Sequence, residues 1–436
     1  MIPVRHGSVT GSTTMATDTT VPLPGKLVAV QLRLLPWAAL IGIACSAVLL
    51  GVGKVEELIH HLLWQHLPGW LGIHDGAHNR WWIVAVLTFV GLAVGLTVRY
   101  APGHAGPDPA TESLVAPPMP VAVLPGLLLA TVLALGGGVS LGPENPITAA
   151  NIALAWWFAH TVLKRQDTAT WVALGAAGTV GALFGTPVAA ALILSEVLVS
   201  RPGQRMWDQL LAPLLAGAAG SLATTVIGAP SLSLTLPPYR GFELVDLVSG
   251  TVIVLSATAL GVAGAYAFPY LHTWFHSMRA PVLMLGVGGL CLAVLGAIGG
   301  EITLFKGLDQ MNELVTGLPG FGNAQLLMYA LVKLAALITA ATCGFRGGRI
   351  FPAAFVGVAA GCLSHGLVPG VPLALAIGAG VMGMVTAATR QGWLSLFMGV
   401  AITGDLKLLP VLCVLIIPAW LLCVGRPPLQ IEHPQA

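Results

Sequence analysis

Long apolar segments recur along the chain, separated by short polar or Gly- and Pro-rich stretches. A simple membrane-spanning helix needs about 20 apolar residues. Several segments are shorter, and others are interrupted by Gly or Pro, which is typical of discontinuous or re-entrant helices that line a pathway. We therefore predict an all-α, polytopic membrane protein with many tilted, short and re-entrant helices. The segments lie near residues 35–53, 82–99, 121–138, 146–163, 170–198, 210–228, 244–268, 281–299, 324–345, 350–369, 371–388, 393–403 and 408–424.

Composition supports a membrane protein. The chain has 436 residues, of which 56% are hydrophobic and only 8% charged, with a mean hydropathy of +0.87. A soluble domain carries about 25% charged residues, so this chain cannot cover itself with a soluble surface. The net charge of +2 gives no support for a nucleic-acid partner. The six cysteines lie in apolar runs without a CxxC pair, which indicates buried small hydrophobes rather than metal or disulfide chemistry. We expect no cofactor and no metal.

The two ends of the chain are polar. Residues 1–28 are rich in Ser, Thr and Gly and lack the apolar core of a signal peptide, so we predict a short disordered tail. The polar C-terminal stretch is equally brief, so we expect no C-terminal regulatory domain. The predicted transmembrane domain therefore covers residues 29–430.

The polar stretch 228–246 divides this domain into halves, about 29–230 and 242–430. Each half holds one glycine-rich break: GGGVSLGPENP (136–146, the first break) and GFRGGRIFP (344–352, the second break). Corresponding interruptions in two halves are typical of inverted structural repeats with a binding site between them. We therefore expect two structurally related, inverted halves.

The first break places a carboxylate at the start of a helix. Gly142 and Pro143 end one element, and a helical apolar pattern restarts at Ile147, so Glu144 and Asn145 lie at a helix N-terminus. Such a terminus attracts anions through unpaired N–H groups and a partial positive charge. The alternative is a simple N-terminal cap on a surface loop. A charge at the bilayer centre costs roughly 2.5–3.5 kcal/mol on insertion scales, which favours a pathway position.

At this motif the chain resembles the CLC family of chloride channels and anion/proton antiporters. The family signature Gly-Lys/Arg-Glu-Gly-Pro begins a pathway-facing helix, and the resemblance places Glu144 on its gating glutamate. Pro143 replaces the basic residue and Asn145 the second glycine, with Gly142 first in the motif. Since proline has no N–H group, the anion site has one donor fewer. The chain looks most like the small bacterial YfeO-type branch of ion-transport proteins.

The second break resembles the family's GGxFxP segment, another helix N-terminus. The resemblance implies that Gly348 and the backbone amides of Arg349, Ile350 and Phe351 face the anion pathway. The alternative is a loop followed by a small-residue packing helix. The presence of Glu144 in the corresponding break of the other half favours the anion site.

A third segment, GHAGPDP (103–109), stands where the family has its anion-binding serine. The resemblance places Ala105 on that serine and Gly106 beside it. A methyl group cannot donate a hydrogen bond, so the central anion site lacks this ligand. His104 or backbone amides are candidates to replace it, and an ordinary loop histidine is the alternative.

Two further positions bear on proton coupling and on the pathway. In FGTPVAAALILSEVL (184–198), Glu196 matches the first acid of a family pair and is a candidate internal acid. Val197 stands where antiporters carry the second acid, which relays protons. Alternatively, Glu196 simply holds a helix end. Leu429 stands near the place of the family's pathway tyrosine.

The resemblance implies anion transport, with chloride as the family default, across the cell membrane (the inner membrane in a bacterium). It also implies a homodimer with one pathway per subunit, embedded in the lipid bilayer. Glu144 would block the pathway while ionised and open it when protonated. Because Val197 replaces the relay acid, the sequence favours a passive channel, and an anion/proton antiporter with protons as second substrate is the alternative.

An intramembrane enzyme is a remote alternative. Such an enzyme needs a nucleophile–base pair or a metal constellation within the membrane segments. The apolar segments contain no HExxH motif and no paired Asp residues. We therefore expect no enzymatic activity.

Overall fold

The computed structural model describes residues 24–73, 76, 78–197, 205–228 and 232–431, and these are mostly helical. The described residues form no β-strand. The two glycine-rich breaks are joined by an isolated β-bridge between Gly142 and Gly348. The all-α prediction is confirmed. The helices are α1 (Pro24–His61), α2 (Leu67–Trp70), α3 (Arg80–Tyr100), α4 (Leu124–Gly136), α5 (Glu144–Thr161), α6 (Thr168–Phe184), α7 (Pro187–Val197), α8 (Met206–Ile227), α9 (Leu244–His276), α10 (Pro281–Gly299), α11 (Leu308–Thr316), α12 (Asn323–Thr342), α13 (Ile350–Leu367), α14 (Leu373–Thr389), α15 (Gly392–Thr403) and α16 (Leu409–Cys423).

Among the described residues, eight helices are long and apolar enough to cross a membrane. They are Gln31–Trp70, Arg80–Tyr100, Met206–Ile227, Leu244–His276, Pro281–Gly299, Asn323–Thr342, Ile350–Leu367 and Leu406–Cys423. Between them lie shorter apolar helices such as α6, α7, α14 and α15. This mixture of long and short elements confirms a polytopic membrane protein.

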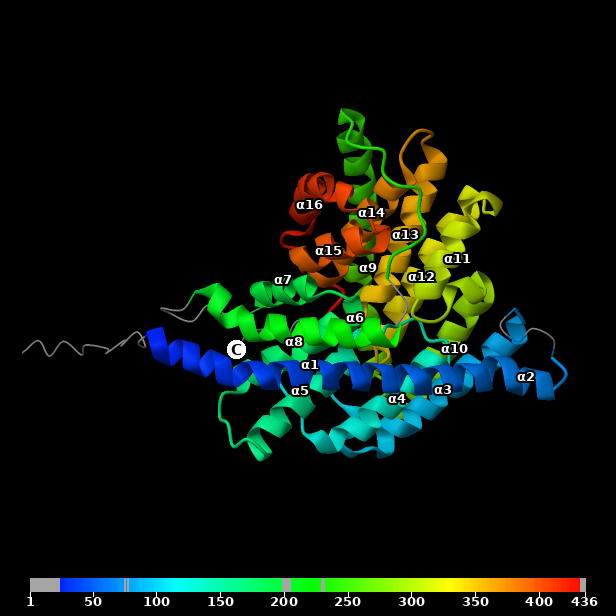
Figure 1. Cartoon of the computed structure of the whole chain (residues 1–436). Coiled ribbons are helices and arrows are strands. Elements are labelled where there is room, and N and C mark those ends of the chain that lie inside the picture. Colours follow the sequence, from blue (N-terminus) through cyan, green and yellow to red (C-terminus); the bar gives the residue numbers. More distant parts are fainter. Residues whose placement is uncertain (1–23, 74–75, 77, 198–204, 229–231, 432–436) are drawn as a thin grey trace, which may run out of the picture.

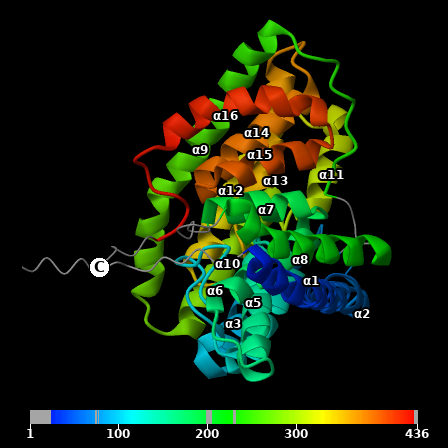
Figure 2. The same cartoon turned by 60° about the vertical axis from the view of Figure 1, so that its left-hand side comes forward.

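The first helix begins earlier than expected. Helix α1 starts at Pro24, inside the predicted disordered tail 1–28, and the remaining tail residues 1–23 lie outside the described residues. The predicted boundary between the halves contains an extended, non-helical stretch over residues 232–243 that leads into α9. In Figures 1 and 2 the blue-to-green first half lies mainly below the yellow-to-red second half.

Glycine allows the helices to pack at very short distances. Gly91 of α3 and Gly289 of α10 face each other, and a Cβ atom on them would lie 2.4 Å from the Leu285 carbonyl oxygen and 2.5 Å from the Leu87 carbonyl oxygen, respectively. In the second half, a Cβ atom on Gly357 of α13 would lie 2.5 Å from the Val381 Cα of α14. Small residues at helix contacts are typical of membrane proteins, where backbones must approach closely to gain packing energy. The high glycine content therefore builds the helix contacts.

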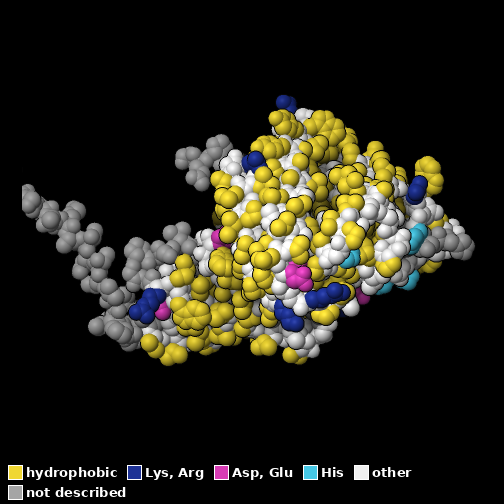
Figure 3. Space-filling view, turned by 90° about the horizontal axis from the view of Figure 1, so that it is seen from above, with side chains coloured by type: hydrophobic (Ala, Val, Ile, Leu, Met, Phe, Trp, Pro, Cys, Tyr) yellow, Lys and Arg dark blue, Asp and Glu magenta, His cyan; other side chains and the backbone are white. Residues whose placement is uncertain are grey.

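The outer surface is largely apolar. Figure 3 shows hydrophobic side chains over most of the visible face, with few charged groups. Large exposed hydrophobics occur on both halves, including Leu222 and Val226 on α8, Val248 and Val252 on α9, and Leu421 on α16. Such a surface suits contact with lipid chains.

Candidate functional site

The two glycine-rich breaks meet in the interior. The Gly142 N–H donates to the Gly348 carbonyl oxygen (2.8 Å), and the Gly348 N–H donates to the Gly142 carbonyl oxygen (2.6 Å). Helix α5 begins two residues after the first of these glycines and α13 two residues after the second. The bridge therefore brings two helix N-termini from different halves to one place.

Glu144 lies between these two termini. Its side chain is fully buried, and its Oε1 accepts a hydrogen bond from the Ile350 N–H at the start of α13 (2.6 Å). The other carboxylate oxygen, Oε2, is buried without a hydrogen-bond partner among the described residues. Unpaired N–H groups and the helix dipole favour a negative charge at such a terminus. The Glu144 carboxylate is thus bound at the N-terminus of α13, the helix that begins in the second break.

Two glycines make room for the carboxylate. A Cβ atom on Gly142 would lie 2.0 Å from Glu144 Oε2, and a Cβ atom on Gly348 would lie 2.2 Å from Glu144 Cδ. Both separations are far below van der Waals contact. Any larger residue at either position would collide with the carboxylate in its observed place.

The residues before and after Glu144 line different cavities. Pro143 and Phe351 line a large cavity of about 1470 Å³. Asn145 and Gly347 line a small cavity of about 30 Å³, which is also bounded by Arg346. The start of α5 therefore borders both cavities.

Aromatic rings and charged groups shape the large cavity. The Phe184 ring lies 6.1 Å from that of Phe351 and 5.6 Å from that of Phe397, centroid to centroid. Lys306 and Glu56 also line this cavity and form an ion pair, with Nζ 3.1 Å from Oε1. The remaining ionisable lining residues are Lys54, Glu57, His60, Glu301, Asp309 and Glu313. The cavity thus combines charges of both signs with an aromatic wall beside the site.

Arg346 joins the 103–109 loop, which carries Ala105 and Gly106, to the second break. Its Nη1 donates to the Pro107 carbonyl oxygen (2.8 Å), and its Nη2 donates to those of His104 (2.8 Å) and Gly106 (2.9 Å). Ala105 is fully buried, and a Cβ atom on Gly126 of α4 would lie 3.6 Å from its methyl carbon. The loop that carries Ala105 and Gly106 is therefore held beside the site through carbonyl oxygens bound to arginine.

Arg349 begins α13 but directs its guanidinium elsewhere. Its Nη1 donates to the Leu429 carbonyl oxygen (2.5 Å), and its Nη2 donates to the Glu112 carbonyl oxygen (2.8 Å). Leu429 is itself fully buried, and its N–H donates to the Ala388 carbonyl oxygen (3.2 Å). The Arg349 side chain thus ties the C-terminal stretch and the 110–112 loop to the start of α13.

Replacing Arg349 with Ala should lower stability. The substitution leaves the Leu429 and Glu112 carbonyls without their charged donor, and a hydrogen bond to a charged group contributes about 1.5–3 kcal/mol. Arg349→Lys should recover only part of the loss, because an ammonium cannot reproduce the planar fork. Thermal unfolding in detergent measures this, with Arg33→Ala on the exposed part of α1 as control. Equal thermal unfolding midpoints for Arg349→Ala and Arg33→Ala would show that the Arg349 hydrogen bonds do not stabilise the fold.

Glu196 lies at a junction of two helices. Its Oε1 accepts from the Gly392 N–H (2.9 Å), and its Oε2 accepts from the Trp393 N–H (3.4 Å). These amides begin α15, whereas Glu196 and Val197 end α7. Glu196 thus links the end of α7 to the start of α15.

Sequence reasoning missed a buried lysine near the first break. Lys333 of α12 is fully buried, and its Nζ donates to the carbonyl oxygens of Thr303 (3.1 Å), Leu304 (2.8 Å) and Phe305 (2.8 Å). The Phe305 N–H in turn donates to the Gly138 carbonyl oxygen (3.0 Å). A lone Lys within an apolar segment was an available signal, because such residues are costly and need partners. Lys333 holds the 303–305 segment against the first break.

The profile of the family described as "Voltage gated chloride channel" matches residues 87–423. "Putative ion-transport protein YfeO" from Escherichia coli (strain K12 / DH10B) and its counterpart from Escherichia fergusonii are each 48% identical over 398 residues, covering 91% of this chain and 94% of theirs.

Solved structures agree at the level of the fold. A CLC-type fluoride/proton antiporter has a TM-score of 0.75 at 20% identity, covering 94% of this chain and 100% of that one. A slow cyanobacterial Cl⁻/H⁺ antiporter has a TM-score of 0.78 at 16% identity, covering 91% and 96%. With the profile match over most of its length and relatives at 48% identity, the chain belongs to the voltage-gated chloride channel (CLC) family of membrane proteins.

Proposed function

We propose that the protein transports small inorganic anions, chloride first, through a pathway between the N-termini of α5 and α13. The observation that carries the proposal is the hydrogen bond from the Ile350 N–H to the buried Glu144 carboxylate. The neighbouring residues Pro143 and Asn145 line the large and the small cavity, respectively, which supports a pathway past this carboxylate. Family membership and the fold of the described antiporters support the same activity.

Backbone amides suit an ion that must leave quickly. Helix N-termini supply partial charges, so they replace part of the hydration shell without the tight binding that a full positive charge would give. The Arg346 and Arg349 guanidinium groups are engaged with carbonyl oxygens instead. Ionised Glu144 competes with the anion for the amides. Protonation removes that charge and frees the site, so transport should rise as pH falls.

We propose a passive, channel-like pathway. Val197 stands where the antiporters carry their proton-relay acid, and both Glu196 oxygens accept hydrogen bonds from α15 amides. An anion/proton antiporter is the second candidate, because two structural neighbours are described as antiporters of fluoride or chloride with protons.

Reversal potentials of purified protein in planar bilayers distinguish the two candidates. With a chloride gradient alone, the reversal potential should equal the chloride equilibrium potential. An added pH gradient should not shift it, because a passive anion pathway moves no coupled proton. A shift with the pH gradient would support antiport and contradict the channel. The absence of any anion-dependent current or flux would contradict anion transport itself.

The proposed function also implies an assembly and a domain organisation. We propose a homodimer with one pathway per subunit in the cell membrane, since one chain supplies both helix N-termini of the site. We further propose a single transmembrane domain over residues 29–430, made of halves about 29–230 and 242–430. The meeting of one break from each half at Gly142 and Gly348 supports that division.

A further inference from the structure

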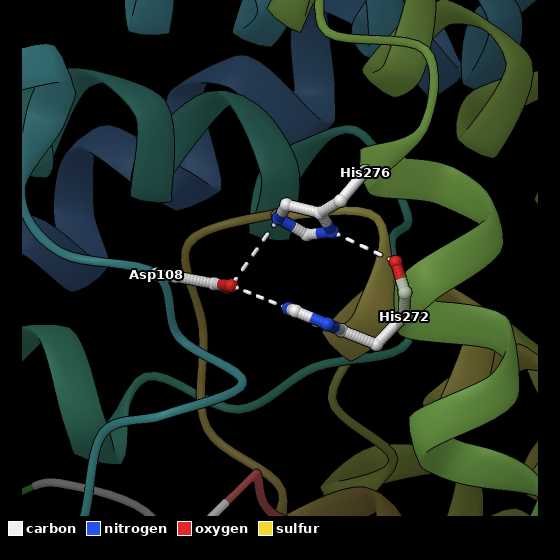
Figure 4. A group of neighbouring side chains, drawn as sticks. All are labelled: Asp108, His272 and His276. Atoms are coloured by element: carbon white, nitrogen blue, oxygen red, sulfur yellow. Dashed lines mark hydrogen bonds and ion pairs between the residues drawn. The ribbon is translucent and has the colours of Figure 1, made fainter. Parts of the chain in front are cut away.

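A second cluster of ionisable groups lies outside the anion site. His272 and His276 are one turn apart at the C-terminal end of α9, and Asp108 lies in the loop that follows α3. The Nε2 atoms of His272 and His276 lie 2.7 Å and 3.2 Å, respectively, from the same Asp108 oxygen, Oδ2. Figure 4 shows both rings approaching the carboxylate from one helix, and the rings stack at 3.9 Å between centroids.

The hydrogen bonds of this cluster create a place for a cation. His276 Nδ1 lies 3.0 Å from the His272 carbonyl oxygen. Because a carbonyl only accepts, Nδ1 carries the proton, and Nε2 of the neutral ring presents a lone pair. That lone pair faces the Asp108 carboxylate oxygen, which is also an acceptor. Two facing acceptors need a proton or a metal ion between them.

The Asp108 carboxylate is oriented by a backbone hydrogen bond. The Ala110 N–H binds the other oxygen, Oδ1, at 3.0 Å, which orients Oδ2 toward the histidines. The cluster thus offers a fixed negative charge to a bound cation.

We propose that Asp108, His272 and His276 form a binding site for a divalent transition-metal ion of the Zn²⁺ class. Their three ligand atoms lie within 4.8 Å of one another. Zinc binds His nitrogen and carboxylate oxygen at about 2.0–2.2 Å, so side-chain adjustments on the order of 1 Å complete the coordination. Two imidazoles favour zinc, cobalt, nickel or copper over magnesium and calcium, which prefer oxygen ligands.

The surroundings of the three ligands fit a metal site. The Nδ1 contact of His276 and the Ala110 contact of Asp108 are outer-shell hydrogen bonds of the kind that orient metal ligands. The side chains of His272, Asp108 and His276 are 18%, 26% and 35% exposed, so an ion can reach them from the protein surface.

Metal binding at this site would act on the loop beside the anion pathway. Pro107 and Pro109 flank Asp108 and line the small cavity together with Asn145. The Pro107 carbonyl oxygen also accepts from Arg346 in the second break. A metal ion that ties Asp108 to α9 would restrict this loop. Resting on the proposed transport function, we infer that Zn²⁺ slows anion flux.

Calorimetric titration of the purified, metal-free protein with Zn²⁺ tests the site. We expect one ion per chain. The affinity should fall in His272→Gln and His276→Gln by more than the roughly 10- to 100-fold that loss of an outer-shell partner costs. His160→Gln is the matched control, since His160 is an exposed helical histidine that stacks on Trp156. Added Co²⁺ should give visible ligand-field absorption with the wild type and the control only.

Metal binding and anion transport are tested by separate results. Absence of Zn²⁺ binding to the wild type, or equal affinity in wild type and a His272→Gln/His276→Gln double variant, would overturn the site. Without metal, size-exclusion elution volumes and thermal unfolding midpoints equal to those of the wild type would show that the variants are folded. In liposomes, Zn²⁺ should slow chloride efflux of the wild type but not of the double variant. Equal slowing in both would overturn the coupling, whereas absence of efflux in all samples would contradict the proposed function and leave the binding result intact.

Discussion

Glu144→Gln should carry chloride out of liposomes much faster than the wild type at neutral pH. The substitution removes the charge that binds the Ile350 N–H. A hydrogen bond to a charged group contributes about 1.5–3 kcal/mol. Since 1.4 kcal/mol corresponds to tenfold in an equilibrium constant, an anion should displace the side chain roughly 10- to 100-fold more easily. The wild type should accelerate as pH falls, because protonation also removes the charge, whereas the variant should show no such acceleration.

Asp167→Asn is the matched control for this experiment. Its carboxylate also accepts a hydrogen bond from a backbone amide at a helix start, but it caps α6 on the exposed surface. We expect the control to keep the wild-type rate and acid response. If Glu144→Gln gave the wild-type rate at every pH, Glu144 would not be the gate.

Gly348→Ala should force the Glu144 carboxylate out of its observed position. The added Cβ atom would lie 2.2 Å from both Glu144 Cδ and Oε1. Overpacking of a well-packed interior typically costs about 1–3 kcal/mol, so the thermal midpoint should fall. Removing the side chain in Gly348→Ala/Glu144→Gly should restore much of the midpoint. A double-mutant cycle of unfolding measurements in detergent gives this coupling directly.

Gly320→Ala is the control for that cycle. A Cβ atom on Gly320 would meet nothing within 4 Å, so its midpoint should match the wild type and its effect should simply add to that of Glu144→Gly. An equally additive result for Gly348→Ala would show that the glycine does not make room for the carboxylate.

The central geometry could be predicted from local sequence signals. Gly and Pro around Glu144 end one helix and start another, and GGRIFP does the same at Ile350. Proline fixes its own φ and has no N–H group, and glycine adopts conformations that other residues avoid, so local sequence indicates where these two helices start. In the structure, α5 begins at Glu144 and α13 begins at Ile350.

Contacts between distant side chains could not be predicted in the same way. The second break contains Arg346 and Arg349, but the sequence does not show that both bind carbonyl oxygens more than 75 residues away. The Asp108–His272 contact likewise spans 164 residues. Such contacts depend on how the two halves pack, which the apolar pattern of each segment leaves open. The start of α1 was missed for another reason, because its first residues, Pro24-Gly25-Lys26, form no apolar pattern.

Chloride binding by Glu144→Gln tests the central claim most directly, namely that a small anion takes the place of the Glu144 carboxylate. Calorimetric titration with chloride at neutral pH should show clear binding to Glu144→Gln and much weaker binding to the wild type. Lowering the pH should bring the wild type toward the variant. Equal chloride affinity of the two proteins at both pH values, or no binding to Glu144→Gln, would contradict the account.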